Sequence, residues 1–227
     1  VMSLPQPKKP ETVVAKTEAP KSETKPDQQA ASTTASPTQA AAPTASAEVP
    51  VPGSFDDPKA IRDYVFELGK GIRAVASHLR KQDLKNPLAY RYNRTGLWQL
   101  AQMPPIHSGN KTYIKGLDRA SRAELDTLKT NSKFAELVEA AEIRVSQTPL
   151  LLDLHRYTAA GLEALGAEYE PAKQAVILEL RGLLERYPEL PKLSTNEGTP
   201  LGDAETQGWL NEHVVIKRFK RFEIGSD

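Results

Sequence analysis

The sequence predicts an all-helical domain, a compact bundle of about seven helices arranged as hairpins, behind a disordered N-terminal tether. Three observations predict this fold class. Apolar residues recur at spacings of three and four, which is typical of helices with one buried face. Proline, glycine, asparagine and aspartate stand where helices would begin and end. Alternating polar and apolar runs, which are typical of half-buried strands, are nearly absent.

The first 54 residues differ in composition from the rest of the chain. They contain nine of the 18 prolines and no phenylalanine, tyrosine or tryptophan. Such a segment has too little apolar surface to offset the entropy lost on ordering. We therefore predict a disordered Pro/Ala/Ser/Thr-rich linker over residues 1–54 and one helical domain over residues 55–227. Because the sequence begins with Val1 rather than a methionine, we also expect a further domain upstream.

Charge and cysteine content argue against several function classes. The formal net charge is +1, so no global field attracts the chain to nucleic acid or to a membrane surface. The absence of cysteine removes disulfides and thiolate metal sites, and it fits a reducing compartment. No apolar run approaches the roughly 20 residues that span a bilayer.

The first helix is expected to begin at Asp57, a good N-cap, with Pro58 in the first turn. Apolar residues then recur at spacings of four and three as far as Leu79, which makes a narrow stripe along one side. The stripe has two interpretations, a face turned to the core or a contact with a second copy of the chain. The candidate dimer interface consists of Ile61, Tyr64, Val65, Leu68 and Ile72.

The second helix lies within residues 86–105. Asn86 is a good N-cap, Pro87 suits the first turn, and the paired prolines at 104 and 105 cannot continue a helix. Its buried side is expected to hold Leu97, Trp98, Leu100 and Ala101.

Arg91 and Arg94 are three residues apart, so we expect them on one face of the second helix, near Tyr90 and Trp98. Such a pair can clamp a carboxylate or phosphate in an enzyme. Equally, guanidinium groups can stack on aromatic rings and join neighbouring helices. No nucleophile or base stands beside them, so we favour the structural interpretation.

The remaining helices have clear boundary signals. Asp118 or Ser121 can begin the third, Ser132 the fourth and Asp203 the last, and Gly166 suits a left-handed cap at the end of the fifth. They are expected from 118 or 121 to 131, and over 132–148, 150–165, 171–187 and 203–222.

Catalytic and metal-binding patterns are missing. The four histidines include no pair at i, i+4 and no HExxH motif, so we predict no metal site. His155 and Asp153 point to different faces of a helix, which argues against an acid–base pair. GKGIR at 69–73 lies inside a helix, unlike a phosphate-binding loop. The basic run KRFKR at 217–221 is interpreted as a solvated helix face, so we predict no catalytic residue, cofactor or nucleic-acid partner.

Three motifs in order resemble a known family. NPLAYRYNRTGLW with SGNKTYI, then AEIRVSQTPLLLDLHRYTAAGLEALGAEYEPAKQAV, then EGTPLGDAETQGWL, with Asp203 and Trp209, span most of residues 55–222. Together they resemble the middle domain of TssA subunits of the bacterial type VI secretion system, the VasJ or ImpA-related group. The chain lacks a tryptophan that some relatives carry near Lys133.

The resemblance implies a non-enzymatic, cytoplasmic scaffold subunit. It implies that this domain forms a homodimer and connects other domains, and that the full-length protein builds a larger ring. The implied partners are baseplate, tail-tube, sheath and membrane-complex components, whose assembly the subunit coordinates without inserting into the membrane. The motif residues Asn86, Pro87, Tyr90, Arg91, Arg94, Trp98, Asp203 and Trp209 are expected to have structural roles.

Two other functions stay open. A tetratricopeptide-like adaptor that holds a partner peptide is suggested by the Leu-Gly-x-x-Tyr spacing at 165–169, although no second copy occurs at a period of 34 residues. An enzyme acting through Arg91 and Arg94 would require a concave pocket that holds both groups.

Overall fold

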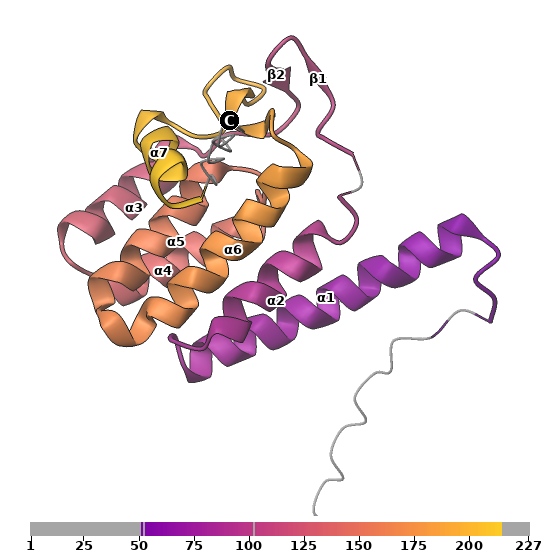
Figure 1. Cartoon of the computed structure of the whole chain (residues 1–227), viewed down its shortest axis with the longest axis horizontal. Coiled ribbons are helices and arrows are strands. Elements are labelled where there is room, and N and C mark those ends of the chain that lie inside the picture. The colour runs from indigo at the N-terminus through magenta and orange to yellow at the C-terminus, as the bar shows by residue number, and fades with distance from the viewer. Residues whose placement is uncertain (1–50, 52, 102, 215–227) are drawn as a thin grey trace, which may run out of the picture. The chain divides into compact units, whose positions relative to one another are not determined.

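The computed structural model describes residue 51 and residues 53–101 and 103–214, and it confirms the all-helical prediction (Figure 1). Seven α-helices and a two-stranded hairpin make up the regular structure of this part of the chain, with short 3₁₀ and π turns. The predicted tether falls almost wholly outside the described residues, and so does the last helix beyond Val214.

The helices occur in the predicted order, with bounds close to those expected. They are α1 (Pro58–Gln82), α2 (Pro87–Trp98), α3 (Arg119–Thr130), α4 (Phe134–Val145), α5 (Leu152–Leu165), α6 (Glu170–Arg186) and α7 (Ala204–Trp209). The short turns are η1 (Ala167–Tyr169), η2 (Leu190–Lys192) and the π-helical η3 (Leu210–Val214).

Four helices begin at a side chain that accepts a hydrogen bond from the first turn. Asp57 caps α1, Asn86 caps α2, Asp118 caps α3 and Asp203 caps α7. Each carboxylate or amide oxygen satisfies a backbone N–H that the helix itself leaves without a partner. The sequence signal for where these helices begin is therefore physical and local.

Three predicted helix ends are wrong. The second helix ends at Trp98 and not at Pro104, because the chain turns at residues 99–100 to start the connection to α3. The fourth begins at Phe134 behind Lys133, which makes no side-chain cap, rather than at Ser132. Gly166 ends α5 with φ 114° and ψ 176°, an extended positive-φ conformation open to glycine, and not a left-handed cap.

A small hairpin interrupts the connection between α2 and α3. β1 (His107–Ser108) pairs antiparallel with β2 (Lys111–Thr112), and Gly109 at the turn has φ 60°. Thr112 donates both its backbone N–H and its hydroxyl to the carbonyl oxygen of Ser194, at 2.9 and 2.7 Å. The hairpin is too short to give an alternating pattern, and the sequence did not predict it.

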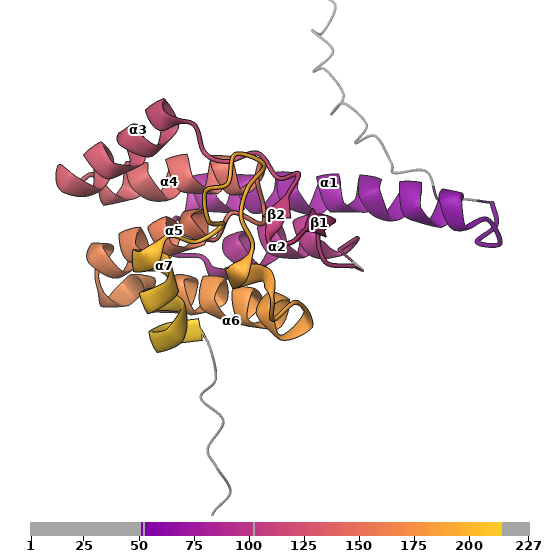
Figure 2. The ribbon, with the colours of Figure 1, turned by 90° about the horizontal axis from the view of Figure 1, so that it is seen from above.

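The core consists of apolar side chains from α4, α5 and α6, closed by Trp98 and by residues that follow α6. Leu137, Leu154, Leu180 and Leu190 are fully buried in it. A second buried cluster contains Ala89, Tyr90, Val138, Ala159, Leu162, Ala172 and Val176. Figure 1 shows α4, α5 and α6 on one side of α1. In Figure 2 the first half of α1 extends beyond the other helices.

α1 and α2 cross at two glycines. A Cβ on Gly69 would lie 2.7 Å from the carbonyl oxygen of Gly96, and a Cβ on Gly96 would lie 2.7 Å from that of Gly69. Glycine at both positions lets the two backbones touch. The GKGIR stretch is thus part of a helix crossing.

Candidate functional site

A buried carboxylate holds four helices together at the centre of the domain. Glu142 of α4 is fully buried and accepts a hydrogen bond from Nη2 of Arg94 on α2, at 2.9 Å. Nη1 of Arg80 on α1 lies 3.9 Å from Glu142, and Nε of Arg80 also pairs with Glu139. Thr158 of α5 donates to Glu142 at 3.0 Å. Removal of a single partner would leave a buried charge unpaired.

The environment keeps Glu142 ionised. Burial by itself would raise the pKa of Glu142, but the positive charges of Arg94 and Arg80 and a hydrogen bond from Asn93 outweigh burial and lower it. The network is therefore a charged one at neutral pH, built from residues of α1, α2, α4 and α5.

His155 of α5 joins this network as a neutral side chain. Its Nδ1 lies 3.1 Å from Nη2 of Arg94, which can only donate, so Nε2 carries the proton and donates to the carbonyl oxygen of Pro149 at 3.1 Å. Burial and the charge of Arg94 lower the pKa of His155 from 6.5 to about 3. Asp153 contacts a different set of residues, so no His–Asp pair forms.

A second polar network joins α3, α5 and α7. Asp153, fully buried on α5, accepts hydrogen bonds from Nη2 of Arg122, from the backbone N–H of Asp203 and from the hydroxyl of Thr206. Nε of Arg156 donates to the Thr206 hydroxyl at 2.8 Å. Asp203 therefore caps α7 with its side chain, and it donates its backbone N–H to Asp153, which ties α7 to α5.

The two arginines of α2 do not lie together, and the expectation that they share a face is wrong. Arg94 is fully buried against Glu142, whereas Arg91 is exposed and pairs with Glu179 of α6 at 3.1 Å. Each arginine therefore joins α2 to a different helix. No clamp for a single anion is formed by the two groups.

The other motif residues also lie in packing positions. The Tyr90 hydroxyl donates to the carbonyl oxygen of Leu84 at 2.6 Å, and burial raises the pKa of Tyr90. Trp98 is 3% exposed, donates Nε1 to the carbonyl oxygen of Pro149 at 3.3 Å and meets the His155 ring edge-on at 5.4 Å. Trp209 is half-buried against the core.

The sequence analysis did not identify Glu142 or Arg80, and it considered Asp153 only as a partner of His155. A signal was present for Glu142, because it follows Val138 by four residues and so shares the buried face of α4 with Leu137, Ala141 and Val145. An acid on an apolar helix face predicts a buried partner, but the sequence does not say which basic residue pairs with it.

The apolar stripe of α1 is only partly covered by the other described residues. Of the candidate interface residues, Ile61 is exposed and Tyr64, Val65, Leu68 and Ile72 are half-buried. None of the five belongs to either buried cluster or packs against one. The stripe is therefore only partly covered in the described part of the chain, and both interpretations, a face turned to other helices and a contact with a second copy, stay predictions.

Two shallow pockets flank the stripe where α1 lies on α2. One is lined by Pro58, Ile61, Arg62, Val65, Gln99 and Leu100. The other is lined by Ile72, Val75, Tyr92 and Thr95, and Val75 is 50% exposed. The stripe and these pockets form one surface, which we call the α1 stripe; it is mainly apolar, with Arg62 and Gln99 at the first pocket.

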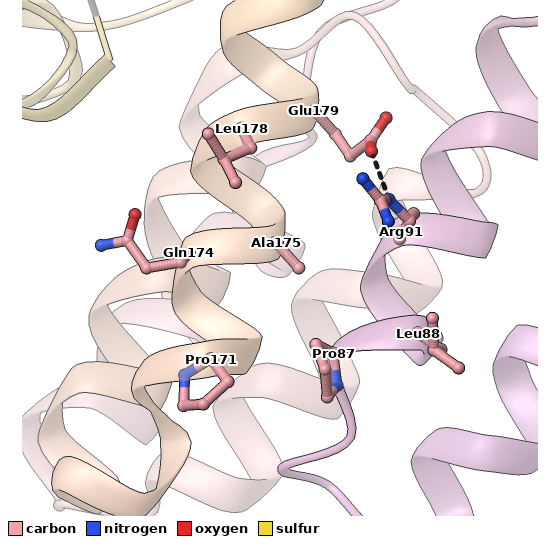
Figure 3. Close-up of a pocket in the computed structure, with 8 residues that line it drawn as sticks. All are labelled: Pro87, Leu88, Arg91, Pro171, Gln174, Ala175, Leu178 and Glu179. Carbon is pink, nitrogen blue, oxygen red and sulfur yellow. Dashed lines mark hydrogen bonds and ion pairs between the residues drawn. The ribbon is translucent and has the colours of Figure 1, made fainter.

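A separate groove lies between α2 and α6 (Figure 3). In the close-up, Ala175 and Glu179 of α6 point toward α2, and Gln174 points away from it. The Arg91–Glu179 ion pair crosses one end of the groove. Its walls are lined by Pro87, Leu88, Arg91, Pro171, Gln174, Ala175, Leu178 and Glu179. We call this the α2–α6 groove.

Groups that would hold a metal ion do not gather within residues 53–101 and 103–214; no cluster of three acidic, histidine or cysteine side chains occurs there. Within the same ranges, every helix is too short or too polar to cross a membrane. The most prominent chemical features of the described residues are thus the two buried polar networks and the open apolar surfaces.

The fold and these surfaces define the class: an all-helical domain with apolar faces available for protein contacts. The comparisons with known proteins give the family. A family model described as "Type VI secretion, EvfE, EvfF, ImpA, BimE, VC_A0119, VasJ" matches residues 66–225. The chain belongs to this family, and it is a type VI secretion protein. A search of curated proteins gave no match.

Proposed function

We propose that the chain is a non-enzymatic, cytoplasmic assembly subunit of the type VI secretion system, the TssA subunit. In this proposal it coordinates assembly of the baseplate with that of the tail tube and sheath, in contact with the membrane complex. This domain forms a homodimer and connects the other domains of the protein. The family match over residues 66–225 supports the first part, and the α1 stripe supports the second.

The observation that carries the dimer is the exposed apolar surface of α1. Ile61 and Val75 are 37% and 50% exposed, and the stripe between them extends over 14 residues. At 1.5 Å per residue this is about 21 Å of helix. Burial of apolar surface stabilises by roughly 25 cal/mol per Å², so an uncovered stripe of this length favours a partner.

A second copy of the chain is the simplest partner. In a two-fold symmetric contact the same stripe serves both subunits, so each apolar residue of α1 is used twice. A modest contact of this kind gains strength when further domains add parallel contacts, because the second binding event becomes intramolecular. A scaffold can therefore assemble from individually weak interfaces.

A second candidate function is a helical adaptor that binds a partner peptide. The α2–α6 groove favours it, since Leu88 and Leu178, 40% and 51% exposed, offer apolar surface on both walls. In that case the groove, and not the α1 stripe, would be essential for binding.

Substitution of the stripe tests the proposed dimer. Ile61→Glu combined with Val75→Glu places two charges on the α1 stripe at exposed positions, where folding should not suffer. Ala74→Glu with Lys81→Glu is the matched control, because both residues are exposed and lie on the opposite side of α1.

Light scattering would give the molar mass of each variant, with circular dichroism to verify the helical fold. We expect a monomer for the stripe variant and a dimer for the control. A folded dimer in the stripe variant would exclude this surface as the contact. In cells, the stripe variant of the full-length protein should form fewer fluorescent sheaths than the control.

A further inference from the structure

The hairpin between α2 and α3 carries the most exposed large apolar side chains of the described residues. Met103, Ile106 and Tyr113 are 78%, 78% and 80% exposed. Single exposed apolar residues are common on protein surfaces, whereas apolar residues that gather on one face indicate an interaction site. The backbone of the hairpin and the direction of its side chains decide which of the two applies here.

The backbone of the hairpin is held in place by the segment that follows η2. Ser194 donates its backbone N–H and its hydroxyl to the carbonyl oxygen of Asn110, at 2.7 and 3.1 Å, and accepts both bonds from Thr112. Asn196 donates its N–H to the carbonyl oxygen of Ile114 at 2.8 Å. A partner that binds the hairpin therefore loses little free energy in ordering its backbone.

The pairing of β1 with β2 places Ile106 and Tyr113 on one face. His107 pairs with Thr112, so the same register, continued by one residue, sets Ile106 opposite Tyr113. Thr112 is buried, and successive side chains of an extended segment alternate between two faces. Tyr113 and Ile106 therefore stand together on the solvent side of the hairpin.

Two lysines flank this apolar pair. Lys111 and Lys115 each lie two residues from Tyr113, so the alternation that exposes Tyr113 exposes them on the same face. Both are exposed, and the lysine ion pairs of the described residues involve other lysines. The face thus combines apolar surface with two positive charges that no described acid neutralises.

Acidic residues are sparse around the hairpin. The sequence contains none from residue 84 to residue 117. Glu197 comes close, because a Cβ on Gly116 would lie 3.5 Å from its Oε2, but it pairs with neither lysine. Charge complementarity therefore favours a negatively charged partner. Two lysines would neutralise too few phosphates to hold a nucleic acid, so an acidic segment of a protein fits better.

We propose that Ile106, Lys111, Tyr113 and Lys115 bind an acidic segment of a partner protein that carries an apolar side chain. The apolar side chain covers Ile106 and Tyr113, and carboxylates beside it accept hydrogen bonds from the two lysines. This face shares no residue with the α1 stripe or the α2–α6 groove, so the proposal does not depend on the proposed dimer.

Two double variants of the unaltered chain remove the two parts of the face. Ile106→Ala with Tyr113→Ala removes the apolar part, and Phe66→Ala with Ile143→Ala is the matched control, since Phe66 and Ile143 are 49% and 53% exposed on α1 and α4.

Lys111→Gln with Lys115→Gln removes the charges. Lys59→Gln with Lys81→Gln is its control, because both of these lysines are exposed on α1. Circular dichroism would verify that all four variants keep the helical fold.

Short random peptides displayed on phage would be selected on the unaltered chain and then sorted by their binding to each variant. We expect the peptides that the apolar variant no longer binds to carry aspartate or glutamate next to an aromatic or branched apolar residue. The Kd of one such synthetic peptide, measured by fluorescence anisotropy, should rise at least about tenfold for the apolar variant. It should rise about two- to tenfold for the charge variant and less than about twofold for either control.

Three results would overturn the proposal. The first is a selection in which no peptide is lost on the apolar variant. The second is a group of lost peptides without acidic residues. The third is binding to phosphatidylglycerol vesicles that the apolar variant abolishes while every peptide is retained, which would assign this face to a membrane surface.

Discussion

Substitution of Gly69 by alanine should weaken the contact between α1 and α2. The added Cβ would lie 2.7 Å from the carbonyl oxygen of Gly96 and 2.1 Å from Nε2 of Gln99. The Gln99 side chain can move, although it would lose its hydrogen bond to the carbonyl oxygen of Val65. The Gly96 oxygen belongs to the backbone of α2, so relief there requires the two helices to separate.

Gly71 supplies the matched control on the same helix. A Cβ at Gly71 meets nothing within 4 Å, so Gly71→Ala has only the helix propensity gain, up to about 1 kcal/mol. Gly69→Ala has the same gain but also an overpacking cost of about 1–3 kcal/mol. The free energy of unfolding should therefore be about 1–3 kcal/mol lower for Gly69→Ala than for Gly71→Ala.

Urea denaturation followed by circular dichroism would measure this difference, with thermal unfolding as a second reading. For a domain of this size a difference of 2 kcal/mol corresponds to about 4–8 °C in Tm. Equal stability of Gly69→Ala and Gly71→Ala would refute the close crossing of α1 and α2.

The polar networks and the buried tryptophan give three further predictions. Glu142→Leu should lower the free energy of unfolding by about 3–5 kcal/mol, because buried Arg94 loses its carboxylate, whereas Glu136→Leu on the exposed face of α4 should cost less than about 0.5 kcal/mol. The pKa of His155 is lowered from 6.5 to about 3, so between these values the unfolded chain binds a proton that the folded chain does not. The free energy of unfolding should therefore fall as the pH is lowered through this window, by up to about 1.4 kcal/mol per pH unit. His155→Gln should remove that part of the slope in a pH series of urea titrations. Trp98→Ala should cost about 3–5 kcal/mol in the same assay, and an unchanged midpoint would mean that the tryptophan is exposed in solution.

The start of a helix could be predicted from the sequence where a single side chain determines it. Asp57, Asn86 and Asp203 each bond a backbone N–H two or three residues away, so the signal and its effect lie within one turn. The end of α2 could not be predicted in this way. It depends on the hairpin that follows, and Thr112 of that hairpin is held by Ser194, 82 residues further along the chain.

The polar centre shows a different limit of sequence reasoning. An acid on an apolar helix face predicts burial, but Glu142 pairs with Arg94, 48 residues away, and only the packing of α2 on α4 makes that contact. The separation of Arg91 from Arg94 has the same cause, since α4 and α6 lie on different sides of α2. Spacing along one helix does not reveal which neighbour each side meets.

The position of the α1 stripe could be predicted from the spacing of its apolar residues, but the exposure of the stripe could not. The 4-3 repeat describes both a core face and a seam between copies. A core face and a seam between copies differ only in whether other helices of the same chain cover the stripe. Ile61 and Val75 remain exposed in the described part of the chain.

Sedimentation equilibrium of the unaltered chain tests the central claim, self-association of this domain, most directly. Across a series of micromolar loading concentrations, we expect the mass to approach twice the chain mass of 24.9 kDa. A mass of 24.9 kDa at every concentration would contradict the account, and would leave the stripe to a different partner.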